Sequence, residues 1–146
     1  GLLPKKLPKI PIIMMNGDIL TKINFEQLLN FHEKQEGDIT ICTREHAVEI
    51  PFGVVDVQNQ QARSIIEKPI KNFFVNAGIY VISSELVSQV SHNEHLDMPF
   101  FLEKQINKGK IVNVFPIYEY WLDIGHMKSY KQANQDIDAL FSQLSK

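Results

Sequence analysis

The chain has 146 residues, of which 44% are hydrophobic and 22% are charged, so it is long enough for one globular domain with a buried core. Its 15 basic and 17 acidic side chains give a net charge of -2, which excludes a general attraction to nucleic acid or to an anionic membrane. No apolar run approaches the roughly 20 residues that span a bilayer. The single cysteine, Cys42, excludes an internal disulfide and favours a cytoplasmic location.

The first elements are a strand and a helix. Prolines in residues 1–10 predict an extended and loose N-terminus. The apolar run IPIIMM, residues 10–15, predicts a short strand buried on both faces, as in a parallel sheet. Asn24 opens a capping-box pattern that predicts a helix, and Gly37 is expected to end it.

The middle of the chain predicts strands. Residues 38–46 alternate between polar and apolar side chains, and residues 52–58 and 62–69 form two runs separated by a short polar turn, which indicates a hairpin. Residues 73–82 predict a further strand that contains Gly78. A glycine inside a strand indicates a bulge or the close approach of another group.

The C-terminal third alternates helices and strands. Ser84 can begin a short helix, and Asp97 can cap a longer one over residues 98–108. Short strands at 111–117 and 118–125 and a final amphipathic helix follow. The order of elements predicts an α/β fold with a mixed sheet.

Asp18 has two interpretations from the residues alone. It follows Asn16 and Gly17 directly after the first predicted strand, where a small polar residue can simply complete a turn or cap a helix. It can also bind a metal ion, which requires a second ligand elsewhere. Asp123 is the natural second carboxylate, because it too follows a short strand, and strand ends in an open α/β sheet converge on a ligand crevice.

Four short motifs stand in order: NGD at 16–18, EKP at 67–69, NAGIYV at 76–81 and YWLDIG at 120–125. This series resembles the sugar-1-phosphate nucleotidyltransferases, also called nucleoside-diphosphate-sugar pyrophosphorylases, and within them the mannose-1-phosphate guanylyltransferase-like members. The resemblance runs from about Ile12 to about Asn134. It implies a Rossmann-like mixed sheet with flanking helices. It also implies Mg2+-dependent nucleotidyl transfer from a nucleoside triphosphate to a sugar 1-phosphate, with release of pyrophosphate.

The sequence departs from this family in one respect. The glycine-rich loop of the form GxGxRLxPLT, which wraps the triphosphate, does not occur in it. We therefore expect residues 1–146 to be a single domain that represents the C-terminal portion of a nucleotidyltransferase catalytic domain, inactive or nearly so by itself. We also expect self-association or a homo-oligomer through an exposed sheet edge.

The resemblance implies two sets of site residues. The catalytic set contains the two Mg2+ ligands and a lysine that offers its charge to the sugar phosphate: Asp18, Asp123 and Lys68. The substrate-binding set contains hydrogen-bonding side chains and glycines that leave room for a sugar: Gly53, Glu67, Lys68, Asn76 and Gly78. Carboxylates suit Mg2+, an ammonium group suits a phosphate oxygen, and an amide both donates to and accepts from a hydroxyl.

Simpler interpretations stand beside these roles. Glu67 and Lys68 can be an exposed ion pair of little energetic value. Asn76 can bond only to backbone at a sheet edge. Trp121 can stack on a ligand or pack in the core, and His126 has no assigned role.

Three other functions compete. The absent glycine-rich loop favours a non-catalytic sugar-phosphate-binding module with a regulatory or assembly role. A phosphocholine-type cytidylyltransferase is a variant of the enzyme, although choline would require an aromatic cage. A metal-dependent glycosyltransferase would present two carboxylates as D-x-D, whereas NGD offers one.

Overall fold

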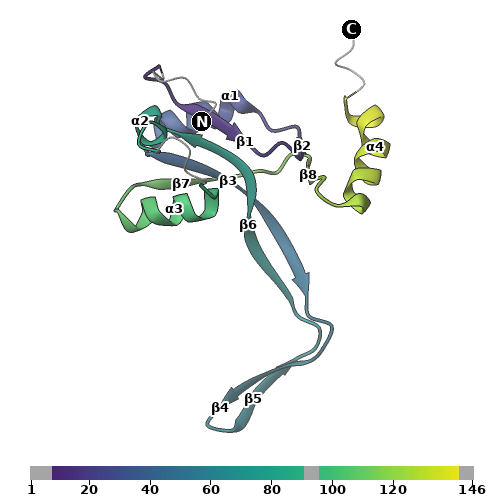
Figure 1. The fold of residues 1–146 in the computed structure, drawn as a ribbon. Coiled ribbons are helices and arrows are strands. Elements are labelled where there is room, and N and C mark those ends of the chain that lie inside the picture. Colours follow the sequence, from purple (N-terminus) through teal and green to yellow (C-terminus); the bar gives the residue numbers. More distant parts are fainter. Residues whose placement is uncertain (1–7, 91–95, 142–146) are drawn as a thin grey trace.

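The computed structural model describes residues 8–90 and 96–141 (Figure 1). Its centre is a four-stranded sheet in the order β1-β6-β3-β7. β6 is antiparallel to both of its neighbours, and β3 and β7 are parallel. The sheet is therefore mixed, as predicted, with strand bounds β1 Ile12–Met15, β3 Ile39–Glu49, β6 Ile70–Ile82 and β7 Val112–Pro116.

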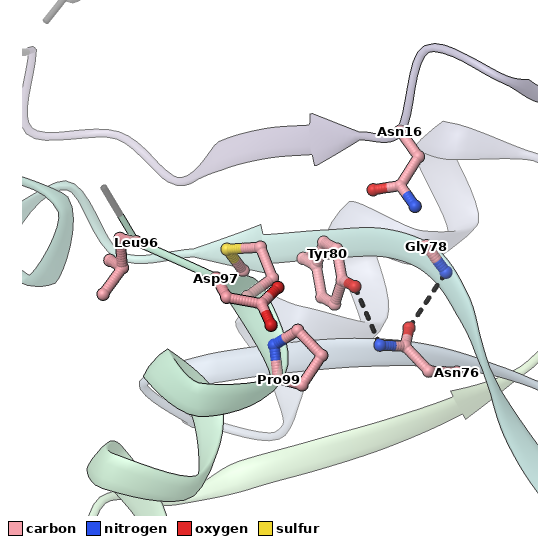
Figure 2. A pocket seen from close by; sticks show the side chains of 8 residues that line it. Asn16, Asn76, Gly78, Tyr80, Leu96, Asp97 and Pro99 are labelled. Atoms are coloured by element: carbon pink, nitrogen blue, oxygen red, sulfur yellow. Dashed lines mark hydrogen bonds between the residues drawn. The ribbon is translucent and has the colours of Figure 1, made fainter.

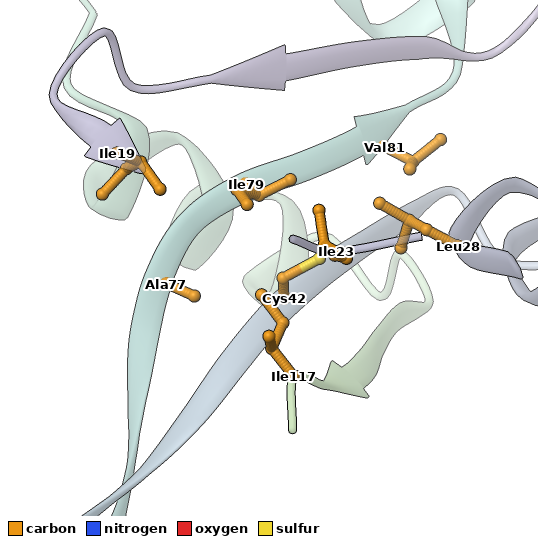
Figure 3. Packing of buried hydrophobic residues seen from close by; sticks show 8 residues of the cluster. All are labelled: Ile19, Ile23, Leu28, Cys42, Ala77, Ile79, Val81 and Ile117. Atoms are coloured by element: carbon orange, nitrogen blue, oxygen red, sulfur yellow. The ribbon is translucent and has the colours of Figure 1, made fainter. Parts of the chain in front are cut away.

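Helices flank this sheet, which confirms the α/β prediction. They are α1 Phe25–Lys34, α2 Ser84–Val87 and α3 Met98–Asn107, whereas α4 Met127–Phe141 lies apart from this sheet, next to β8 (Figure 1). Alternate residues of β6 point to opposite faces, so Ile79 joins a core cluster with Leu28 of α1. Figure 3 shows that cluster. Ile82 joins a second cluster with Phe101 of α3. The two clusters place a hydrophobic core on each side of the sheet.

The α1 helix begins where the sequence predicts and ends earlier than predicted. The Asn24 side chain accepts a hydrogen bond from the Gln27 amide at 3.0 Å, which satisfies one of the free donors of the first turn. The C-cap is Gln35, and the left-handed conformation after it falls on Glu36, with φ 48°. The prediction that Gly37 ends the helix is wrong. Gly37 is instead packed against the Asn113 side chain, where a Cβ atom would clash.

The prediction that the first strand is buried on both faces is also wrong. β1 is an edge strand antiparallel to β6, and its residues alternate between half-buried and exposed. Ile13 is 37% exposed and Met15 45%, because only the other face of β1 packs on the core. Among the described strands, none pairs with its outer edge. Self-association through this edge stays a prediction.

The outer parts of β3 and β6 extend beyond the sheet as a two-stranded arm that carries the hairpin of β4 (Val54–Gln58) and β5 (Gln61–Ile66) (Figure 1). This hairpin was predicted and is confirmed. Its two-residue turn has positive φ at Asn59 (50°) and Gln60 (65°), which matches the twist of the strands.

A small third sheet pairs β2 (Ile19–Thr21) with β8 (Trp121–Asp123) in antiparallel fashion. It joins the start of the chain to the segment that leads into α4. Cys42 is fully buried in the core, and this burial, assisted by the charge of Glu119, raises the pKa of its thiol to about 12. A nucleophilic role for Cys42 is therefore disfavoured.

None of the helices in the described part of the chain is both long enough and apolar enough to cross a membrane.

Protonation of His32 should destabilise the fold. Its buried Nδ1 lies 2.8 Å from the Thr40 hydroxyl, and burial lowers its pKa from 6.5 despite the opposing charge of Glu33. Below pH 6.5 His32 binds a proton in the unfolded chain but not in the folded chain. The free energy of unfolding should therefore fall by up to about 1.4 kcal/mol for each unit that the pH is lowered. Urea unfolding between pH 8 and pH 5 measures the slope.

The control for this prediction is a second histidine. His32→Gln should flatten the pH dependence, whereas the same substitution at exposed His46 should leave it unchanged. Equal pH slopes in the wild type and in His32→Gln would contradict the assignment.

Candidate functional site

The β2–β8 sheet brings the two predicted metal ligands together. Its register pairs Ile19 with Asp123, and the Ile124 amide donates to the Asp18 carbonyl at 2.8 Å. Asp18 immediately precedes one strand, and Asp123 ends the other. They therefore lie at the same end of this small sheet, although 105 positions separate them in the sequence.

Gly125 shows how the two carboxylates are oriented. A Cβ atom on Gly125 would lie 3.0 Å from Asp123 Oδ1 and 3.3 Å from Asp18 Oδ2, so both carboxylates face the same small space. The Gly125 amide donates to Asp123 Oδ1 at 2.8 Å and fixes that side chain. The absence of a side chain at Gly125 keeps the space open.

The donor set in this space fits a hard divalent cation. Mg2+ is commonly bound by one or two carboxylates, and its other ligands are phosphate oxygens and water. Asp18 and Asp123 are both exposed, so such ligands can reach them. No group of three His, Cys, Asp or Glu side chains in the described residues could hold a metal by itself. The arrangement thus resembles a metal site in which substrate phosphates and water provide the remaining ligands, rather than a structural site closed by protein side chains.

Hydrogen bonds from Trp121 and Arg44 fix the segment that leads to Asp123. Trp121 packs beside the core, and its indole Nε1 donates to the Ala77 carbonyl at 2.9 Å. Arg44 donates to the carbonyls of Ile117 and Glu119 at 3.0 and 2.8 Å. Of the two interpretations of Trp121, core packing agrees with the structure. The part played by Arg44 was not predicted, because a strand arginine carries no local signal of its distant partners.

A pocket of about 370 Å³ lies on the α3 side of β6 (Figure 2). It is lined by the predicted residues Asn76 and Gly78 and by six others: Asn16, Tyr80, Leu96, Asp97, Met98 and Pro99. Asn76 Nδ2 donates to the Tyr80 hydroxyl at 2.8 Å, and Asn76 Oδ1 accepts from the Gly78 amide at 2.9 Å. Asn76 thus orders the pocket wall as well as contributing to it.

Three polar pocket residues were missed by the sequence reasoning. Tyr80 stands inside the NAGIYV motif, four residues after Asn76, and this spacing was the available signal. Asp97 was recognised only as a helix cap. Asn16 was treated as part of a turn, and its place in the pocket depends on the contact between β1 and β6.

At Gly78 the chain after β1 comes close to the backbone of β6. Its φ is +71°, a conformation that favours glycine, and a Cβ there would lie 2.8 Å from Asn16 Nδ2. The Asn16 amide also donates to the Gly78 carbonyl at 2.9 Å. The pairing of β6 with β3 shifts register here, since Ile41 pairs with Tyr80 and Thr43 with Asn76. The extra residues of β6 form the bulge that the sequence predicts.

The structure does not bring Glu67 and Lys68 to this pocket. Both are exposed and follow β5, at the junction between the hairpin and the arm (Figure 1). Gly53 faces Glu67 there, since a Cβ on Gly53 would lie 2.9 Å from Glu67 Oε2. The strand from Ile70 to Asn76 runs about 20 Å along the arm at 3.3 Å per residue. Motif order in the sequence could not reveal this separation.

His126 is exposed and immediately precedes the last helix, α4. Its carbonyl accepts the Tyr130 amide at 2.9 Å, as the residue before α4. The Tyr120 hydroxyl donates to Asp136 Oδ2 at 2.8 Å and ties the same helix to β8. These contacts give His126 a structural position and no part in the pocket.

Comparison with known proteins identifies the family. The nucleotidyl transferase family matches residues 3–139. A putative mannose-1-phosphate guanyltransferase from Sulfolobus acidocaldarius is 31% identical over 130 residues, covering 86% of this chain and 35% of that protein. A glucose-1-phosphate adenylyltransferase from Clostridium kluyveri is 26% identical over 138 residues, covering 86% of this chain and 36% of that protein. The chain belongs to the nucleotidyl transferase family, and its resemblance to sugar-1-phosphate nucleotidyltransferases is confirmed.

Solved structures share the fold. A putative glucose-1-phosphate thymidylyltransferase from Bacillus anthracis, in complex with a sucrose, gives a TM-score of 0.61 at 20% identity, over 87% of this chain and 54% of that one. HddC from Yersinia pseudotuberculosis gives 0.60 at 21% identity, over 87% of this chain and 55% of that one. The chain thus spans about a third of the curated relatives and about half of the solved chains.

Proposed function

We propose that this chain carries the metal-binding carboxylates and the sugar pocket of an enzyme that transfers a nucleotide from a nucleoside triphosphate to a sugar 1-phosphate. The observation that carries this proposal is the convergence of Asp18 and Asp123 on one space. Asn16, which lines the proposed sugar pocket, is only two residues before Asp18 in the sequence. Membership of the nucleotidyl transferase family supports the reaction class.

The proposed roles follow from the chemistry of each group. Asp18 and Asp123 would hold Mg2+, which when bound supplies positive charge to the reacting phosphates. Gly125 keeps the space between the carboxylates clear and orients Asp123 through its amide. Asn76 and Tyr80 would hydrogen-bond sugar hydroxyls from the pocket wall and hold the sugar in place for attack.

We retain Glu67 and Lys68 as proposed substrate ligands on the strength of the EKP motif alone. Gly53 is retained as a glycine that leaves room for the sugar, on the strength of the family resemblance. Their position at the arm junction does not support that role directly. Among the described residues that line the pocket there is no lysine or arginine, so the positive charge for the sugar phosphate would have to come from another part of the protein. A cytoplasmic location and self-association also stay predictions.

The alternative is a non-catalytic sugar-binding module. The pocket favours it, because no lysine or arginine stands among the described residues that line it and could hold a phosphate group. The choline variant is disfavoured, since Tyr80 is the one aromatic residue among the described residues of the pocket lining, and a single ring does not form a cage.

Pyrophosphate release tests the function. The chain is incubated with Mg2+, GTP, ATP or TTP, and α-D-mannose or α-D-glucose 1-phosphate. It is used both alone and extended at its N-terminus by the glycine-rich segment of a relative. We expect release from the extended protein and little from the chain alone. Absence of release from both, with sugar phosphate still bound, would favour the binding module.

A methyl group at Gly125 should block the shared space. Gly125→Ala would place a Cβ between Asp123 Oδ1 and Asp18 Oδ2, where a bound cation needs room. We expect turnover of the extended protein to fall about 100-fold, comparable with the loss of one preorganised electrostatic group, while the unfolding midpoint changes little. Pyrophosphate release and thermal unfolding measure the two effects.

The matched control is Gly17→Ala, between Asn16 and Asp18 on the loop that leads into β2. A Cβ on Gly17 would meet nothing within 4 Å, so turnover should be retained. Equal losses in the two variants would show that the Gly125 effect is not steric.

A further inference from the structure

Asp97 occupies the N-cap position of α3 but does not cap the helix. It has the extended backbone of an N-cap, with φ -83° and ψ 130°, and its side chain makes no capping hydrogen bond. An N-cap aspartate ordinarily accepts from the amide of the second or third helical residue. The second residue here is Pro99, which has no N–H to donate. The Asp97 carboxylate instead forms part of the pocket wall (Figure 2).

Tyr80 lines the same pocket as Asp97, and its hydroxyl proton can be donated to a ligand. Its oxygen accepts from Asn76 Nδ2 at 2.8 Å, so its own proton is available to a ligand. Burial raises the pKa of Tyr80, the Asn76 hydrogen bond opposes this, and the negative charge of Asp97 adds to it. The hydroxyl thus stays protonated near neutral pH, and the Asp97 carboxylate is close enough to influence it.

The pocket therefore presents an acceptor and donors to the same small volume. A carboxylate can only accept hydrogen bonds, whereas Tyr80 and the Asn16 amide can donate. A sugar ring matches this set, because each of its hydroxyls both donates and accepts. A carboxylate or phosphate group placed beside Asp97 would be repelled, and an ammonium group would be accepted.

We propose that Asp97 is a specificity-determining residue that accepts a hydrogen bond from a sugar hydroxyl and selects neutral sugars over uronic acids. This inference rests on the proposed function, which supplies a sugar phosphate as the ligand. The phosphate group would point away from Asp97, because the carboxylate repels it and no lysine or arginine is among the described residues of the lining.

Charge and hydrogen bonding make opposite predictions for Asp97→Asn. Removal of a negative charge should tighten the binding of any anionic ligand, including a sugar phosphate. Loss of a charged acceptor for a hydroxyl should weaken binding of the sugar by about 10-fold. Weaker binding therefore cannot arise from the change in net charge.

The test is a calorimetric titration of the 146-residue chain. The probes are α-D-mannose 1-phosphate, α-D-glucose 1-phosphate, α-D-glucuronic acid 1-phosphate and inorganic phosphate. In Asp97→Asn we expect about 10-fold weaker binding of the two neutral sugar phosphates, no loss for inorganic phosphate, and a smaller gap between glucose and glucuronic acid. Asp97→Ser, which keeps a favourable N-cap residue, should show the same loss for the neutral sugars.

The control is Glu103→Gln, which removes one negative charge from an exposed position of the same helix. It should leave the sugar affinities unchanged. Unchanged sugar affinity in both Asp97 variants would overturn the inference and leave the proposed function standing. An equal loss in Glu103→Gln would also overturn it. Absence of sugar-phosphate binding by the wild-type chain would overturn the inference and the sugar-pocket part of the proposed function together.

Discussion

Asparagine in place of Asp18 or Asp123 should lower the affinity of the protein for Mn2+, used here as a probe for Mg2+, by at least about 10-fold, the typical value of one charged contact. Both carboxylates face the space beside Gly125, so one ion would use both. The double variant should therefore lose less than the sum of the two single losses, because the two substitutions act on the same ion. Calorimetric titration of the four proteins measures this coupling.

Asp56→Asn is the control for that cycle. Asp56 is exposed on β4, in the hairpin at the far end of the arm, and its loss changes the net charge by the same amount. Mn2+ affinity should stay the same in this variant. Losses at Asp18 and Asp123 that simply add, or an equal loss at Asp56, would mean that the two aspartates do not share an ion.

Gly78→Ala should be the most destabilising single substitution at the site. The left-handed conformation at φ +71° costs an alanine about 1 to 2 kcal/mol. The new Cβ would also displace Asn16, whose Nδ2 would otherwise lie 2.8 Å away. Urea unfolding should show a total loss of about 2 to 3 kcal/mol.

Gly17→Ala again serves as the comparison. Gly17 lies next to Asn16, and a Cβ there would meet nothing within 4 Å. The substitution should therefore change the free energy of unfolding by less than about 0.5 kcal/mol. If Gly78→Ala proved as mild as Gly17→Ala, the close approach of Asn16 to the Gly78 backbone would not exist in solution.

Much of the local structure could be predicted because its causes are local. The Asn24 cap, the Asn59–Gln60 hairpin turn and the bulge at Gly78 each depend on residues close together in the chain. The meeting of Asp18 and Asp123 could be expected on a different ground, since both follow short strands and strand ends converge in α/β sheets.

The rest depends on contacts that the sequence does not display. The apolar run of β1 predicts burial on both faces, but partners on each side decide burial, and β1 lies at an edge of the described sheet. Glu67 and Lys68 share a motif series with Asn76, yet the length of β6 between Ile70 and Asn76 separates them. Asp97 has the pattern of a helix cap, and only the fold places its carboxylate beside Tyr80.

The central claim is that Asp18 and Asp123 form one cation site. Mn2+ broadens the amide NMR signals of residues near it, so a titration of the isotope-labelled chain locates the ion directly. We expect selective broadening around Asp18, Asp123 and Gly125 that disappears in the Asp18→Asn, Asp123→Asn double variant. Broadening centred elsewhere, or broadening that persists in the double variant, would contradict it.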